Sequence, residues 1–155
     1  MSKFLDDWKV GEIYITKGRT IGECDVSTFA GLTGDHHANH TDARYMRDSI
    51  FGERIAHGLL GLSVAHGLMM QLNIITDNSI ALLGIEDWKF HKAIVFGDTI
   101  YAKISVQDII FSRGKQDRGV LKLFFEVFNQ KDELCQSGCK VLMMKRKSKE
   151  ENGND

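Results

Sequence analysis

The chain has 155 residues, of which 43% are hydrophobic and 26% charged, and its formal net charge is -1 at pH 7. This composition is ordinary for one globular domain with its own core. The near-zero charge provides no electrostatic footprint for nucleic acid. We therefore expect a small molecule as the partner and no nucleic acid.

Three cysteines, Cys24, Cys135 and Cys139, form an odd set. The last two are four residues apart in an expected strand, so roughly 13 Å separates them, too far for a disulfide. The first ten residues lack the apolar core of a secretory signal. We expect a reducing, cytoplasmic setting.

The first half of the chain predicts two short helices. One spans Asp25 to Leu32 and is closed by Gly34, which suits the left-handed conformation after a helix. The other is capped by Thr41 or Asp42 and runs towards Ser49.

The most apolar segment is GLLGLSVAHGLMM, from Gly58 to Met70. As a helix it is about 20 Å long, too short for a hydrocarbon slab of about 30 Å. Its apolar residues go all the way round instead of forming one stripe. We expect a helix buried inside the protein and no membrane association.

Strands dominate from Ile80 onward. Apolar and other residues alternate in Thr99 to Gln107 and again in Gly119 to Asn129. The polar stretch Asn129 to Glu133 suits a hairpin loop that leads into a last strand, Leu134 to Met144. The pattern predicts an antiparallel meander.

Two phenylalanines, Phe124 and Phe128, fall on the outward face of this meander. Exposed aromatic side chains favour contact with the N-terminal elements or with another subunit, so we expect a homodimer or a higher homo-oligomer. The charged residues 145–155 are expected to form a frayed tail after the last strand.

The candidate chemistry lies in FAGLTGDHHANH, where one carboxylate and three histidines fall within six positions. Three interpretations remain open from the residues alone. Asp35 and Asn39 can be turn residues beside exposed histidines. His36 and His40 can join Asp35 in a metal site if the segment is helical, although Gly34 and Asn39 argue against a helix. Asp35 and His40 can also hold and polarise one water as general acid and base.

The longer stretch FAGLTGDHHANHTDARYMRDSIFGERIAHGLL resembles the MaoC-like dehydratases and (R)-specific enoyl-CoA hydratases. That family carries an Asp, any residue, Asn, Pro, any residue, His element, followed by Arg-Ile-Ala-His-Gly. Asp35 and His40 fall on the first element, and Arg54 to Gly58 reproduce the second. FHKAIVFGDTI, residues 90–100, and the N-terminal Trp8 to Gly11 extend the similarity over most of the chain.

The resemblance implies an α+β hotdog fold in residues 1–144, with a long central helix wrapped by an antiparallel sheet and acyl tunnels near a dimer interface. It implies addition of water to a trans-2-enoyl-CoA, giving an (R)-3-hydroxyacyl-CoA, or the reverse reaction. The substrate is then an acyl-CoA or acyl carrier protein thioester, with Asp35 and His40 as catalytic residues and neither cofactor nor metal. The backbone N–H of Gly58, at the start of the helix, is suited to stabilise the oxyanion.

Several positions depart from the family pattern. His37 and Ala38 replace its Asn and Pro, and Ala93 replaces a later Pro. A family Ser that contacts the reacting region corresponds to His66, with Ser63 one turn earlier, and we count both as expected substrate-binding residues. His66 can equally be a buried histidine bonded to a neighbour.

Two other functions compete with hydration. Within the same fold, a carboxylate can activate water against the thioester carbonyl, as in hotdog thioesterases. The altered positions also fit a non-catalytic acyl-thioester binding protein. Release of free thiol separates the thioesterase from the hydratase, and binding without turnover identifies the third alternative.

Overall fold

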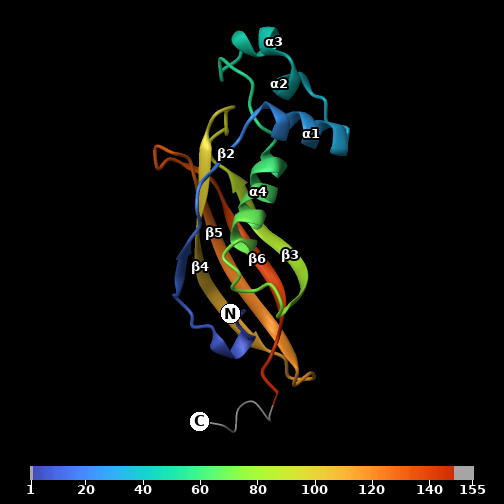
Figure 1. Ribbon diagram of the computed structural model, residues 1–155, viewed down its shortest axis with the longest axis vertical. Coiled ribbons are helices and arrows are strands. Elements are labelled where there is room, and N and C mark those ends of the chain that lie inside the picture. Colours follow the sequence, from blue (N-terminus) through green and yellow to red (C-terminus); the bar gives the residue numbers. More distant parts are fainter. Residues whose placement is uncertain (1, 149–155) are drawn as a thin grey trace.

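The computed structural model describes residues 2–148. Within them, six strands form an antiparallel sheet in the order β1-β4-β5-β6-β3, and β2 also pairs with β4. The long helix α4 lies against this sheet, and α1, α2 and α3 gather at one end of the molecule (Figure 1). The elements are η1 (Leu5–Asp7), β1 (Ile13–Ile15), β2 (Arg19–Thr20), α1 (Glu23–Thr33), α2 (Ala38–Thr41), α3 (Ala43–Arg47), α4 (Gly58–Met70), β3 (Ser79–Phe90), β4 (Thr99–Phe111), β5 (Arg118–Phe128) and β6 (Leu134–Lys145).

The inner face of the sheet is built by the alternation that the sequence predicts. Side chains at every second position from Ile100 to Val106 in β4, and from Leu121 to Val127 in β5, are at most 2% exposed, because they pack under α4 in one core. The hairpin between β5 and β6 lies where expected, and its Asn129 side chain accepts backbone N–H groups of Lys131 and Glu133. The predicted α+β class with an antiparallel meander is confirmed.

Helix α4 has the predicted bounds, but it is not buried all round. Leu60, Val64 and Leu68 point into the core, whereas Leu59 is 61% exposed and Ser63 is exposed. One face of α4 packs on the sheet. The opposite face of the helix, which carries Leu59 and Ser63, is not covered by the described residues of this chain. The expectation of a fully enclosed helix is therefore wrong for the isolated chain.

The N-terminal helices form as predicted, with one addition. Helix α1 ends at Gly34, whose φ of 78° is the left-handed conformation that glycine adopts without strain. Asp42 caps α3 by accepting the N–H groups of Arg44 and Tyr45. The additional one-turn helix α2 contains His40, although Asn39 argued against a helix there.

The outward-facing Phe124 and Phe128 are half-buried. Phe128 stacks on Tyr101 of β4 with ring centroids 5.6 Å apart, so a neighbour within the chain covers part of it. The large exposed apolar surface lies elsewhere, on β3, where Leu82 and Leu83 are each nearly half exposed. Edge strand β3, rather than the two phenylalanines, is the surface that lacks a cover.

The predicted C-terminal tail begins later than expected. Strand β6 continues to Lys145, and Arg146 forms an ion pair with Asp6 at 2.9 Å. Lys147 pairs with Asp7 at 2.7 Å. These contacts fix the first part of the predicted tail against η1, and residues 149–155 lie outside the described part of the chain.

All three cysteines are free thiols, as their spacing indicates. Burial raises the pKa of Cys135 to about 11, so this thiol stays protonated and unreactive. Between residues 2 and 148, no helix has the length and apolarity needed to cross a membrane.

Candidate functional site

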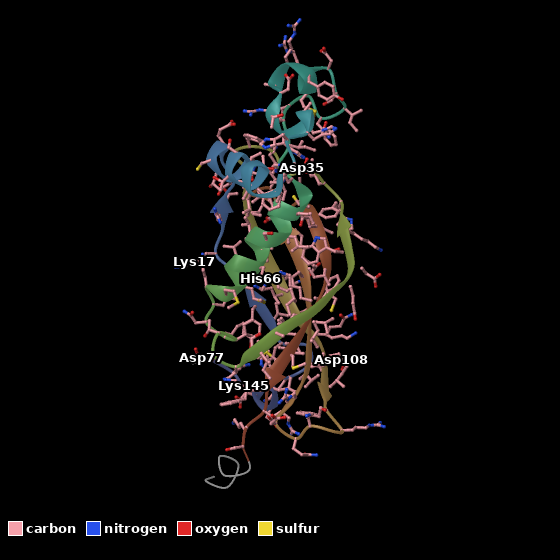
Figure 2. All side chains as sticks on the ribbon, turned by 90° about the vertical axis from the view of Figure 1, so that its right-hand side faces the viewer. Lys17, Asp35, His66, Asp77, Asp108 and Lys145 are labelled. Carbon is pink, nitrogen blue, oxygen red and sulfur yellow. The ribbon has the colours of Figure 1, made fainter. Side chains whose placement is uncertain are left out.

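Asp35, which lies near the start of α4 (Figure 2), comes close to His40, five positions further along the chain. The Asp35 Oδ2 and His40 Nε2 atoms are 4.0 Å apart. Helix α2 makes this possible, because it reverses the chain between the two residues, with the His40 N–H donating to the His37 carbonyl at 2.9 Å. The predicted pair is therefore a spatial cluster.

The orientation of His40 follows from its other ring nitrogen. Nδ1 lies 2.7 Å from the carbonyl oxygen of Ile55, which can only accept a hydrogen bond. Nδ1 therefore carries a proton, and in the neutral form of the ring Nε2 faces Asp35 as an acceptor. The Ile55 N–H donates to the Asn39 carbonyl at 3.0 Å and fixes the same segment from the other side.

The two groups differ in exposure. The His40 side chain is 11% exposed and the Asp35 side chain 53%. The imidazole is held in a fixed position inside the molecule, while the carboxylate reaches solvent. Water has access to the gap between them.

His57, the residue just before α4, completes the cluster. It is 3% exposed, and its ring stacks on that of His40 with centroids 3.7 Å apart. Its Nε2 lies 2.9 Å from the Asp35 carbonyl oxygen, so Nε2–H donates to that backbone group. His57 thereby contacts both the backbone of Asp35 and the ring of His40. Its signals in the sequence are its place just before the helix and its match to the His of the Arg-Ile-Ala-His-Gly element.

A shared metal ion does not fit this cluster, although Asp35, His40 and His57 each bring a ligand atom within 4.8 Å of the others. An imidazole binds a metal along the nitrogen lone pair, which lies in the ring plane. The two rings are stacked with an interplanar angle of 29°, so their lone pairs do not converge on one point. His36, which the sequence offered as a ligand, is absent from this group.

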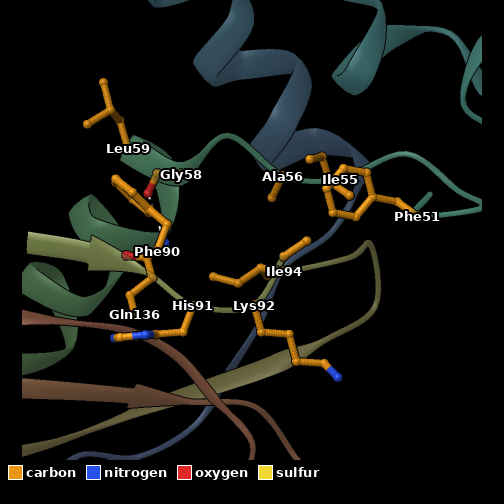
Figure 3. Close-up of a pocket in the computed structure, with 11 residues that line it drawn as sticks. Phe51, Ile55, Ala56, Gly58, Leu59, Phe90, His91, Lys92, Ile94 and Gln136 are labelled. Carbon is orange, nitrogen blue, oxygen red and sulfur yellow. Dashed lines mark hydrogen bonds between the residues drawn. The ribbon is translucent and has the colours of Figure 1, made fainter. Parts of the chain in front are cut away.

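A cavity of about 530 Å³ opens beside the cluster (Figure 3). Its wall is largely apolar and comes from the segment before α4, the start of α4, the end of β3 with the residues that follow it, and one residue of β6. Asp35 and His40 are not among its lining residues. Ile55 connects the two, because it lines the cavity while its carbonyl holds His40.

Gly58 lies between the cluster and the cavity. Its N–H belongs to the first turn of α4, where the helix itself provides no acceptor. A Cβ at this position would lie 2.7 Å from the ring of Phe90, so only glycine fits without displacing that ring. The Gly58 carbonyl accepts from the Gln136 side chain at 3.0 Å, which ties this turn to β6. The predicted oxyanion donor is thus at the cavity wall.

Ser63 and His66 lie further along α4 and do not line this cavity. The Ser63 hydroxyl donates to the Leu59 carbonyl on the exposed side of the helix. His66 lies midway along α4, well separated from Asp35 (Figure 2). Burial, and secondarily the charge of Lys140, lower the pKa of His66.

Arg54 has a structural partner. Its guanidinium donates to both carboxylate oxygens of Glu23, at 2.9 and 2.5 Å, and lies over the Phe96 ring. The pair joins α1 to the segment that precedes α4.

Comparison with known proteins identifies related sequences. Residues 8–123 match the family described as "MaoC like domain". Protein MaoC of Klebsiella aerogenes is 35% identical over 103 residues, which are 66% of this chain and 30% of that protein. The (R)-specific enoyl-CoA hydratase of Rhodospirillum rubrum is 28% identical over 107 residues, covering 69% of this chain and 72% of that enzyme. The chain thus spans less than a third of Protein MaoC.

Solved structures give the same picture of the fold. A monoamine oxidase regulatory protein from Archaeoglobus superposes with a TM-score of 0.89 at 32% identity, covering 95% of this chain and 97% of the other. The (R)-hydratase from A. caviae gives a TM-score of 0.73 at 24% identity, with coverages of 88% and 96%. A Mycobacterium tuberculosis protein described as a double hotdog fold gives 0.81 at 20%, with coverages of 96% and 46%. The hotdog fold is confirmed.

Proposed function

Because the chain belongs to the MaoC-like dehydratase family, we propose that it adds water to a trans-2-enoyl thioester, giving an (R)-3-hydroxyacyl thioester, or catalyses the reverse. The observation that carries this proposal is the 4.0 Å gap between the Asp35 carboxylate and the acceptor nitrogen of His40. The two groups are the proposed catalytic residues.

The gap suits one water molecule. For a water about 2.8 Å from both atoms, the angle at the water oxygen between the directions to the two atoms would be about 90°, close to the angle between its own O–H bonds. Both hydrogens then point at acceptors, and an oxygen lone pair remains free to attack. This arrangement supports a nucleophilic water oriented by two fixed groups.

The chemical step follows from this geometry. The water oxygen bonds to Cβ while one of its protons passes to Asp35 or His40, and the C=C electron pair moves towards the thioester carbonyl. The Gly58 N–H donates to the resulting oxyanion, favoured by the positive end of α4. The captured proton is then delivered to Cα, so that one water is added and the site regains its charge. The apolar cavity beside Gly58 is the proposed place of the acyl chain.

The reaction type is tested on one sample with crotonyl-CoA. Enoyl absorbance and free thiol are followed together, so that addition to Cβ and hydrolysis of the thioester are measured separately. We expect the absorbance to fall with no release of thiol. Release of CoA would identify a thioesterase. Tight binding with neither change, repeated on longer and branched enoyl-CoA substrates, would identify a binding protein.

We also propose a homodimer, formed through β3. Among residues 2–148, this strand pairs only with β6, and it exposes Ile80, Leu82, Leu83 and Ile85, each between 40% and 49% exposed. An apolar strand with a free edge pairs readily with its own copy in antiparallel fashion. Sedimentation velocity is expected to give the mass of two chains. Leu83→Asp should shift the protein towards one chain, whereas Leu32→Asp, on exposed α1, should not; a monomeric wild type would contradict the proposal.

A further inference from the structure

Lys140 is the most deeply buried charged side chain in the described part of the molecule. It lies in β6 opposite Leu123 of β5, and directly opposed residues share a face, so its side chain points into the core beneath α4. It is 0% exposed, and between residues 2 and 148 its Nζ has no hydrogen-bond partner. A buried amine normally has both a counter-ion and acceptors.

The surroundings of Lys140 offer only aromatic faces in place of a carboxylate. Its Nζ lies 4.7 Å from the Phe125 ring centroid and 5.7 Å from that of Trp88. By contrast, the outward-facing Lys122 reaches Glu86 at 2.8 Å. Aromatic faces replace only part of the lost hydration. Desolvation accordingly lowers the pKa of Lys140 to about 7.

A second unsatisfied nitrogen approaches from the opposite layer. Nδ1 of His66, on α4, is buried and also lacks a partner among the described residues. The charge of Lys140 also contributes to lowering the pKa of His66. A sheet residue and a helix residue thus each carry an orphan nitrogen into the core.

His66 and Lys140 lie at similar distances from the proposed oxyanion donor, Gly58. His66 is eight residues beyond Gly58, about 12 Å along the helix. On the sheet, Lys140 is four residues beyond Gln136, about 13 Å along β6, and Gln136 bonds the Gly58 carbonyl. Both routes lead from the cavity wall to the same level. Trp88 stands between them, since its indole N–H donates to Gln136 and its ring faces Lys140.

We propose that Lys140 and His66 bind a carboxylate at the far end of the acyl chain, so that the preferred substrates are thioesters of dicarboxylic acids. This inference rests on the proposed function and specifies its substrate class. A carboxylate accepts hydrogen bonds from both nitrogens and neutralises the buried ammonium. A terminal methyl group does neither. The chain reaches the pair past the Trp88 ring, which must move aside from Gln136.

The experiment compares substrates that differ only at their far end. Turnover is measured for trans-2-hexenedioyl-CoA, trans-2-octenedioyl-CoA and trans-2-decenedioyl-CoA, each against the monocarboxylic enoyl-CoA of the same length. We expect at least one dicarboxylic substrate to have the higher kcat/KM in the wild type. Lys140→Met should lower the dicarboxylic-to-monocarboxylic ratio about 30-fold or more, as expected for loss of one partner of a buried charge pair.

Two further variants make the test specific. Lys122→Met removes a lysine from the opposite face of the neighbouring strand and should leave the ratio unchanged. His66→Leu should lower the ratio in the same direction as Lys140→Met, which keeps the test valid if one variant folds poorly. Preference for the monocarboxylic substrate at every length, or a ratio indifferent to Lys140, would overturn the inference.

Binding separates this inference from the proposed reaction. Calorimetry with the saturated octanedioyl-CoA and octanoyl-CoA requires no turnover. Tighter binding of the dicarboxylic compound that is lost in Lys140→Met supports the inference even if no enoyl-CoA is hydrated. Equal affinities would overturn it even if crotonyl-CoA hydration is fast.

Discussion

Two groups of titratable side chains lie along α4, and they differ in how firmly hydrogen bonds to the backbone hold them. At the start of the helix, His40 and His57 each direct one ring nitrogen to a backbone carbonyl. In the middle, neither Lys140 Nζ nor His66 Nδ1 has a partner within residues 2–148. His57 Nδ1 is also buried without a partner among these residues, but both histidine rings at the start of the helix are held in place through their other ring nitrogen.

The difference separates two kinds of functional site. Groups that must orient a small molecule such as water have to be fixed before it arrives, which the carbonyls of Ile55 and Asp35 achieve. Groups that recognise part of a larger substrate can remain unsatisfied until it binds, at a cost in stability. Substitutions should therefore reduce activity at the first group and increase stability at the second.

The largest effect is expected at His40. His40→Ala removes one of the two acceptors that hold the water, so kcat for crotonyl-CoA hydration should fall by about two to four orders of magnitude. His36→Ala, which changes an exposed histidine outside the cluster, should stay near wild type. Steady-state kinetics on both folded variants measures kcat. Similar losses of kcat in His40→Ala and His36→Ala would contradict a specific role for His40.

Lys140→Met should stabilise the protein, most strongly at low pH. Below pH 7 the lysine is protonated in both states, and the folded state carries a buried charge. Between about pH 7 and the ordinary value of 10.5, the unfolded state binds more protons, so the free energy of unfolding of the wild type rises with pH. Methionine removes this titration and its cost, which is on the order of 3–5 kcal/mol below pH 7.

Urea unfolding at several pH values measures this difference. The variant should be more stable than the wild type at pH 6, and the gap should narrow as the pH rises above 7. Lys122→Met serves as the control because its ammonium pairs with Glu86 near the surface. A Lys140→Met variant that is less stable than the wild type at pH 6 would show that the ammonium has a stabilising partner.

A smaller effect distinguishes two glycines of α4. Gly58→Ala brings a Cβ against the exposed Phe90 ring, which can turn away, so stability should change by less than about 1 kcal/mol. The added Cβ would still lie against the thioester and hinder its approach to the Gly58 N–H, so kcat/KM should fall about tenfold. In Gly61→Ala the added Cβ meets Gln136 and Ile94, which are buried, so about 1–3 kcal/mol of stability should be lost. Thermal unfolding compares the two, and equal losses would contradict this difference.

Much of the fold was predictable because its patterns are local. The apolar run from Gly58 to Met70 gave the bounds of α4, and alternation gave the buried faces of β4 and β5. The exposed side of α4 was not predictable, because uniform apolarity indicates burial without saying which molecule provides it. The sequence similarly placed Asp35 and His40 in one segment, and the family resemblance gave them a role.

Distances within the site depend on contacts that are remote in the sequence. The Asp35–His40 separation is set by Ile55, fifteen residues beyond His40, and by His57 beneath the ring. The sequence did not predict that Lys140 is buried. Both faces of β6 are largely buried, so its sequence lacks the alternation of apolar and polar residues that would have assigned Lys140 to the core. A lysine two residues before Leu142 on the same face was the available signal.

The central claim, that Asp35 and His40 together activate the attacking water, is tested most directly by Asp35→Asn. The amide keeps the size of the carboxylate and an oxygen able to accept from the His37 N–H, but it cannot act as a base at neutral pH. Asp108→Asn, far from the site (Figure 2), controls for the loss of one negative charge. We predict that kcat for crotonyl-CoA hydration falls about 100-fold to 10,000-fold in Asp35→Asn alone. A folded Asp35→Asn variant within tenfold of the wild type would contradict the claim.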